Sequence, residues 1–281
     1  MNIRFRYTIK KSVFGLTFSL MSIAVCFTLD SCNETASAQQ QQNTKSGSER
    51  ATDTTTTESQ EKNLRIFSKE ELLGKLNPAR DTGFVKIEPA YTRKPEIYLR
   101  KEVYDAFKKM FEAAKKSGIQ LNILSATRNF EAQKNIWENK WIDPKYSHLN
   151  EKERALQIMK FSSMPGTSRH HWGTDMDFNN LSPSYFETGE GKKIYDWLSK
   201  NAGDFGFYQT YTNKANGRTG YEEEKWHWTY LPLSKPMLAS YNELITCKDI
   251  SGFRGSTSAQ AVQAIELYVN GIDKSLIDTK Q

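Results

Sequence analysis

The sequence predicts an α+β fold, with a small, mostly antiparallel sheet that carries the functional site and helices packed on its other face. Residues 174–178 (Thr-Asp-Met-Asp-Phe) and 226–230 (Trp-His-Trp-Thr-Tyr) have the alternation, aromatic and β-branched side chains that are typical of strands. By contrast, residues 101–117 place apolar side chains at helical spacing on one face, and Gly118 follows as a helix stop. Helical and strand patterns therefore occur along one stretch of chain, as a mixed fold requires.

The other elements follow in chain order. Ser68 begins a capping box that opens a short helix. The further expected helices are residues 130–141, 151–160, 192–201, 234–245 and 257–269. The further expected strands are residues 84–87, 120–125 and 206–211, with a hairpin-like loop at 214–220. We expect residues 64–232 to form one folded domain and residues 233–281 to form a helical extension packed on it.

The first 38 residues have the pattern of an export signal. A positively charged segment ends at Lys11, and an apolar segment runs from Ser12 to Leu29. The apolar segment is about 18 residues long, so it could also span a bilayer as a retained anchor. Each possibility places the protein outside the cytoplasm, on a bacterial cell envelope.

Two processing sites follow the apolar segment. Residues 29–32 resemble a lipobox, which would make Cys32 a lipidated amino terminus, although Asp30 is awkward at that place. Residues 36–38 (Ala-Ser-Ala) offer an ordinary cleavage site. We prefer the lipoprotein and keep the cleaved periplasmic form open. A lipid anchor would be the chain's only membrane contact.

Residues 39–63 are polar and of low complexity, with a Gln run and a Thr run and almost no large apolar side chain. Such a segment cannot offset the entropy lost on ordering, so we expect a disordered tether. The net charge of the chain is +6, and no basic stripe with interleaved aromatic residues occurs. These features argue against a nucleic-acid partner. Cys247 is the one cysteine beyond the leader, which excludes an internal disulfide in the domain.

Three of the four His residues fall in two short segments, 168–177 and 224–227. A hydrolytic zinc site needs three protein ligands, an open position for water, and a carboxylate beside that water. His170, Asp177 and His227 supply suitable ligands. If the two predicted strands are neighbours, they present Asp177 and His227 on one face, and His170 arrives from the preceding loop. Trp226 and Trp228 would then point the other way, into the core. Glu224 would then be the base.

The motifs Ser-x-His-x6-Asp (168–177) and Glu-x-Trp-His (224–227) resemble those of the LAS zinc peptidases, which include lysostaphin and the hedgehog proteins. The VanY-type D-alanyl-D-alanine carboxypeptidases are the most similar group. Residues 125–133 resemble that family's Ser-x-x-Arg-Ser-x-x-x-Gln segment. The resemblance covers residues 65–232, with Asp175 where many members carry a small residue and Asn129 where many carry Ser. These departures leave the fine substrate preference open.

The resemblance implies a hedgehog-like or D,D-peptidase-like fold and a monomeric, one-zinc carboxypeptidase. Its substrate would be the peptidoglycan stem peptide, from which it removes the terminal D-alanine. Arg128 would stabilise the oxyanion of the tetrahedral intermediate. Ser168 and His171 would line the pocket or form supporting hydrogen bonds around the ligands, and Gln133 would either contact substrate or pack against and hydrogen-bond the loop. His171 is not expected to be a ligand, because adjacent residues on an extended segment face opposite ways and His170 is the ligand.

Two alternatives remain open at this stage. The same scaffold could serve a peptidoglycan endopeptidase or a D,D-dipeptidase, because no single motif distinguishes terminal from internal cleavage. A chain of this family could also be a non-catalytic module that holds zinc and binds cell wall. Glu224 favours an enzyme, because a purely structural zinc site has no use for a base.

Overall fold

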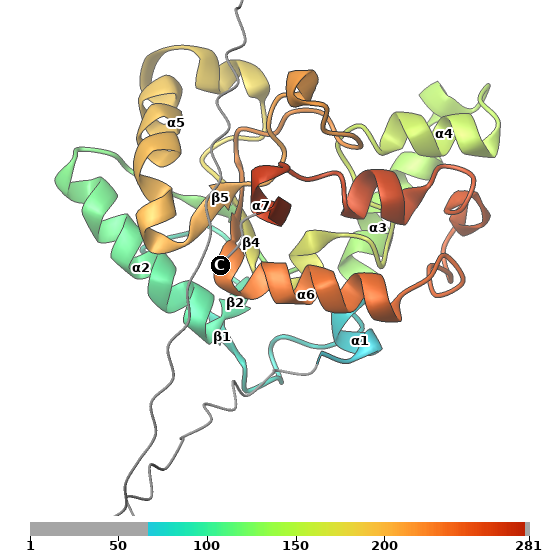
Figure 1. Cartoon of the computed structure of the whole chain (residues 1–281), viewed down its shortest axis with the longest axis horizontal. Helices are drawn as coiled ribbons and strands as arrows, with labels where there is room; N and C mark the ends of the chain where they lie inside the picture. The colour runs from blue at the N-terminus through green and yellow to red at the C-terminus, as the bar shows by residue number, and fades with distance from the viewer. Residues whose placement is uncertain (1–66, 279–281) are drawn as a thin grey trace, which may run out of the picture. The chain divides into compact units, whose positions relative to one another are not determined.

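The computed structural model describes residues 67–278 (Figure 1). The predicted export signal (1–38) and tether (39–63) therefore lie outside the described residues, as do the first residues of the predicted domain. Within residues 67–278, no helix combines the length and the apolar character that crossing a membrane requires.

A four-stranded antiparallel sheet has the strand order β3-β4-β6-β5. Its strands are β3 (Ile123–Ser125), β4 (Asp175–Phe178), β6 (His227–Tyr230) and β5 (Phe207–Gln209). Every one of these strands was predicted, although each is shorter than its sequence pattern. With the helices described below, this sheet confirms the predicted α+β class.

A second, two-stranded sheet pairs β1 (Phe84–Lys86) with β2 (Tyr98–Arg100). The chain passes directly from β2 into α2 (Lys101–Lys116). The ring of Phe107 on α2 stacks on Phe178 of β4 at 5.9 Å between centroids. The apolar face of α2 thus covers one face of the larger sheet, as its spacing predicted.

Side chains cap the amino ends of three helices. Ser68 accepts from the backbone of α1 (Lys69–Leu72), and Asn129 caps α3 (Phe130–Trp141) in the same way. Asn150 forms a capping box with Glu153 at the start of α4 (Glu151–Ile158). In the view of Figure 1, α3 and α4 lie to one side, and α2 and α5 (Gly189–Asn201) lie to the other.

The carboxy-terminal part differs from its prediction in two ways. Helix α6 (Leu231–Leu244) begins three residues early, because Pro232 suits the first turn of a helix. The single helix predicted at 257–269 is wrong. A 3-10 turn (Ser256–Ser258) and a π-helical segment (Ala264–Val269) replace it. Gln263 between them has φ +52°, a left-handed conformation that no continuous helix contains. The last described helix is α7 (Ser275–Asp278).

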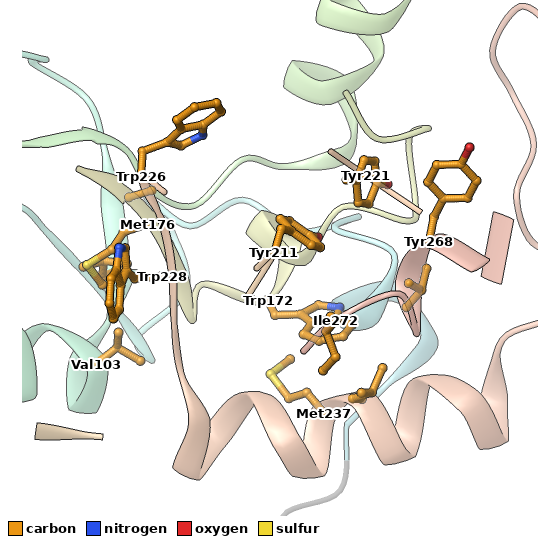
Figure 2. Packing of buried hydrophobic residues seen from close by; sticks show 14 of the residues in the cluster. Val103, Trp172, Met176, Tyr211, Tyr221, Trp226, Trp228, Met237, Tyr268 and Ile272 are labelled. Carbon is orange, nitrogen blue, oxygen red and sulfur yellow. The ribbon is translucent and has the colours of Figure 1, made fainter. Parts of the chain in front are cut away.

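Figure 2 shows how the two sides of the sheet region are filled. Trp228 and Met176 pack towards Val103 of α2, so Trp228 points into the core as its strand position predicted. Trp172 lies over Met237 of α6, and its indole Nε1 donates to the Leu72 carbonyl at 3.1 Å. These contacts hold Trp172 between α1 and α6, and with it the segment that carries the predicted site.

Candidate active site

His170, Asp177 and His227 meet in one buried group, and one ligand atom from each lies within 4.8 Å of the others. Asp177 and His227 face each other as register partners on β4 and β6. Nε2 of His170 lies 3.4 Å from Oδ2 of Asp177, and Nδ1 of His227 lies 3.3 Å from Oδ1. The structure thus brings together the three predicted ligands in the way that strand pairing suggested.

His170 reaches this group from a 3-10 helix (Arg169–Trp172), not from the extended segment that the sequence suggested. Gly173 ends the turn with φ +72°, and a Cβ atom there would lie 2.4 Å from the Phe84 ring. Only glycine therefore fits between the turn and β4. Nδ1 of His170 lies 2.8 Å from the Ala126 carbonyl, which leaves Nε2 facing Asp177.

Glu224 lies at the edge of the same group, with Oε2 at 3.4 Å from Nδ1 of His227. Its backbone N–H donates to the Tyr211 carbonyl at 2.9 Å, and its backbone carbonyl accepts from the His227 N–H at 3.2 Å. Burial raises the pKa of the Glu224 carboxyl. A carboxyl with a raised pKa beside an imidazole is suited to accept and return a proton.

Burial alone would raise the pKa of the Asp177 carboxyl, but His170 and His227 hold it well below its usual range. Burial lowers the pKa of His170, which favours the neutral imidazole that a metal takes as a ligand. Oδ1 of Asp177 is buried without a hydrogen-bond partner among the described residues. Two imidazole nitrogens and a carboxylate with an unsatisfied oxygen are the donors that zinc takes in catalytic sites. The residues present therefore fit a zinc ion.

A cavity of about 530 Å³ opens beside this group. Its charged lining comprises Lys94, Arg128, Lys140, Arg169, Asp177 and Glu224. Its aromatic and apolar lining includes Ile97, Ile136, Phe161, Leu181, Tyr211, Tyr221 and Trp226. Trp226 was predicted to point into the core, and it is indeed buried, but its side chain faces this cavity.

Of the other predicted site residues, two line the cavity. Ser168 does so with a buried hydroxyl that has no hydrogen-bond partner among the described residues. Arg128 does so from the loop between β3 and α3, and its backbone N–H donates to the His170 carbonyl at 3.0 Å. That bond ties the Arg128 loop to the turn that presents His170.

Gln133 and His171 do not line the cavity, which corrects the expectation that they contact substrate. Nε2 of Gln133 donates to the Ser163 carbonyl at 2.7 Å. Nε2 of His171 accepts from the Gly166 N–H at 3.0 Å, so Nδ1 donates to the Arg128 carbonyl at 2.7 Å. Burial lowers the pKa of His171 to about 3. Both side chains are bound to the loops that form the cavity wall, which is a structural role.

The two departures from the family motif also have clear positions. Asn129 caps α3 by accepting from the Ala132 N–H at 2.9 Å. Asp175 is fully buried, and its Oδ1 lies 2.9 Å from Nε2 of His227. Neither residue lines the cavity in the way that a substrate contact would.

Lys140 is one of the cavity residues that the sequence did not predict. It stands in the last turn of α3, where a lysine is usually explained by the helix dipole. Burial and then the charge of Arg128 lower its pKa. Its amine has no ion-pair or hydrogen-bond partner within residues 67–278. No sequence pattern distinguishes such a lysine from a solvated one.

Residues 96–233 match the family model described as VanY, D-alanyl-D-alanine carboxypeptidase. YodJ of Bacillus subtilis (strain 168), which carries a provisional carboxypeptidase name, is 32% identical over 153 residues, or 52% of this chain and 51% of that protein. A D-alanyl-D-alanine carboxypeptidase of Enterococcus faecalis is 29% identical over 122 residues, or 43% and 44%. The chain thus spans about half the length of these curated relatives.

Two solved structures are also similar to this chain. VanYB in complex with D-Ala-D-Ala has a TM-score of 0.46 at 20% identity, covering 71% of this chain and 91% of that chain. The LD-carboxypeptidase LdcB has a TM-score of 0.45 at 28% identity, covering 58% and 75%.

Proposed function

Residues 96–233 match the VanY carboxypeptidase family, and on that premise we propose that the chain is a D-alanyl-D-alanine carboxypeptidase that removes the terminal D-alanine from peptidoglycan stem peptides. The observation that carries the proposal is Glu224, a buried carboxylate 3.4 Å from His227 at the edge of a three-ligand group that opens on a cavity. A structural zinc site would have no use for this carboxylate.

His170, Asp177 and His227 would hold one zinc ion through Nε2, the carboxylate and Nδ1. When bound, zinc supplies Lewis-acid activation of water and of the scissile carbonyl. Glu224 takes the proton from the attacking water and returns it to the leaving amine. The Arg128 guanidinium, which reaches the cavity from the β3–α3 loop, stabilises the negative charge that develops on the carbonyl oxygen.

Two cations favour a substrate with a free carboxylate. Arg128 and Lys140 both line the cavity, and neither side chain has an acidic partner within residues 67–278. A half-buried lysine amine beside a second cation is unfavourable unless an anion binds it. We infer that Lys140 binds the terminal carboxylate of the peptide, which favours terminal over internal cleavage.

The proposed location follows from the substrate. A stem peptide is a cell-wall component, so the chain acts outside the cytoplasm of a bacterium, and residues 1–38 serve as its export signal. Cys32 is the proposed lipid site if the chain is a lipoprotein. We propose a monomer, with the peptide as its partner.

The test is mass spectrometry of a synthetic stem pentapeptide ending in D-Ala-D-Ala, incubated with the zinc-loaded protein and with its Glu224→Gln variant. Loss of one D-alanine with the wild type alone supports the proposal. Loss of both D-alanines indicates a dipeptidase, and cleavage of cross-linked dimers in place of the pentapeptide indicates an endopeptidase. Tight zinc binding with no cleavage of any of these peptides leaves the non-catalytic cell-wall module.

A further inference from the structure

Asp175 is a second carboxylate at the metal group, and it is not one of the three ligands. It stands two residues before Asp177 on β4, opposite Thr229 of β6. Because alternate residues of a strand face the same side, Asp175 and Asp177 both point towards His227. The imidazole of His227 therefore lies between two carboxylates, with Nε2 at 2.9 Å from Asp175 and Nδ1 at 3.3 Å from Asp177.

Asp175 is held rigidly. Its Oδ1 accepts from Nε of Arg169 at 3.1 Å, and its Oδ2 accepts from the hydroxyls of Thr174 at 2.6 Å and Thr229 at 2.9 Å. Arg169 in turn donates from Nη2 to the Thr229 hydroxyl at 3.1 Å. The Asp175 and Arg169 side chains are 0% and 1% exposed. The arginine balances the charge of the carboxylate, which allows it to be buried.

The two imidazole ligands are therefore oriented by different acceptors. His170 has Nδ1 against the Ala126 carbonyl, a backbone group. His227 has Nε2 against a charged carboxylate, which accepts a proton but cannot donate one when ionised. The contact at Nε2 is a hydrogen bond of 2.9 Å, whereas the carboxylates on the other side of the ring, Asp177 and Glu224, lie 3.3 Å and 3.4 Å from Nδ1. The shorter bond places the hydrogen of the neutral imidazole on Nε2. The lone pair is then on Nδ1, the atom that faces Asp177 and Glu224.

We propose that Asp175, held by Arg169, is a positioning residue that fixes His227 in its Nε2–H tautomer and so prepares Nδ1 to bind the metal. This inference rests on the proposed metal site and assigns Asp175 no contact with substrate. Groups that orient a ligating imidazole in this way typically contribute 10- to 100-fold to metal affinity. The acid at position 175 therefore supports the metal through His227.

The test measures zinc affinity and the imidazole tautomer of the full chain, without using activity. Zinc dissociation constants are obtained by competition with a chromophoric chelator for the wild type and for Asp175→Asn, a variant of the same shape without the charge. The double variant Arg169→Met/Asp175→Ala removes both charges and avoids an unpaired buried arginine. Nitrogen-15 spectra of the zinc-loaded wild type report which ring nitrogen of His227 carries the hydrogen.

The control is Asp196→Asn, which makes the same change at an exposed ion pair of Asp196 with Lys192 on α5. We expect Asp175→Asn and the double variant to bind zinc 10- to 100-fold more weakly, and Asp196→Asn to bind it as the wild type does. The spectrum of the zinc-loaded wild type should show the Nε2–H tautomer.

An Nδ1–H tautomer in the wild type would overturn the proposal, even if both variants failed to fold. Zinc affinity within twofold of the wild type in either folded variant would overturn it too. In those cases tight zinc binding by the wild type would leave the proposed function standing. A wild type that binds no zinc would instead refute the proposed function itself.

Discussion

Asp177 of β4 and His227 of β6 are direct register partners, and their Oδ1 and Nδ1 atoms lie 3.3 Å apart. Two short antiparallel strands thus place two proposed ligands without any long loop. A rigid pair of this kind needs little reorganisation to bind a metal. Because the ligands come from different strands, metal binding should also hold the strands together.

Asp177→Ala should abolish tight zinc binding and the thermal stabilisation that zinc gives. A ligand at 100 times its Kd stabilises a folded protein by about 2.7 kcal/mol. The wild type should therefore show a higher Tm with zinc than with a chelator, and Asp177→Ala should show the same Tm in both. Asp196→Ala, which removes an exposed acid of α5, is the matched control and should keep the zinc response. A zinc-dependent Tm in Asp177→Ala would contradict the ligand assignment.

Glu224→Gln should retain zinc and lose most activity. The amide keeps the size of the side chain but cannot accept the proton of the attacking water, and general bases of this kind typically contribute 10²- to 10⁴-fold to the rate. The measurement is kcat on the stem pentapeptide, together with zinc content by atomic emission. If kcat stayed within a factor of about five of the wild type, Glu224 would not be the base.

The grouping of His170, Asp177 and His227 could be predicted because it depends on local patterns. Alternation in two strands fixes which side chains share a face, and their pairing brings the faces together. The helix expected at about 130–141 is confirmed as α3, whose start is fixed locally by the adjacent Asn129 cap.

What could not be predicted depends on contacts between segments far apart in the chain. Lys140 has an ordinary helical setting, and only the folded structure places it beside Arg128. The network of Asp175 requires Thr229 from another strand. The break at Gln263 follows from how residues 256–269 pack, because nothing in their composition forbids a helix.

Arg128→Met should lower kcat by about 10²- to 10³-fold, as removal of one oxyanion donor does in other enzymes. Its effect on the KM of the pentapeptide should be smaller, because the charge it stabilises develops in the transition state. Steady-state kinetics give both values, with zinc content as the control for site integrity. A large rise in KM at unchanged kcat would assign Arg128 to substrate binding.

Lys140→Met should raise KM for peptides with a free terminal carboxylate by roughly 10-fold, as expected for the loss of a charge-assisted hydrogen bond. Lys134→Met on the same helix is the control, because Lys134 does not line the cavity. An equal effect on a peptide amide would refute the role in carboxylate binding, while cleavage by the wild type would still support the proposed enzyme.

The same lysine predicts a pH dependence. Burial and the charge of Arg128 lower the pKa of Lys140 from its ordinary value of 10.5. Carboxylate binding needs the protonated amine, so affinity should be full at neutral pH and should fall as pH rises through this lowered pKa. KM measured from pH 7 to 10.5 should therefore rise in the wild type. In Lys140→Met this alkaline rise should be absent, and its persistence would point to another group.

The carboxy-terminal segment supports the cavity wall formed by Tyr211 and Tyr221. Tyr268 packs edge-on against Tyr221 at 5.1 Å, and the Asp273 N–H donates to the Thr210 carbonyl at 2.9 Å. Gly220 lies between these contacts with φ +75°, and a Cβ atom there would lie 2.3 Å from the Leu267 carbonyl oxygen. The close approach leaves no room for a side chain.

Gly220→Ala should therefore destabilise the fold and loosen this wall. Gly252→Ala is the matched control, because Gly252 has φ +89° but no atom within 4 Å of the added Cβ. The left-handed conformation costs both variants about 1–2 kcal/mol. The clash should cost Gly220→Ala a further 1–3 kcal/mol, as overpacking does. Urea unfolding gives the two values, and KM for the pentapeptide should rise only in Gly220→Ala. Equal stability and equal KM in the two variants would show that the carboxy-terminal segment does not support the cavity.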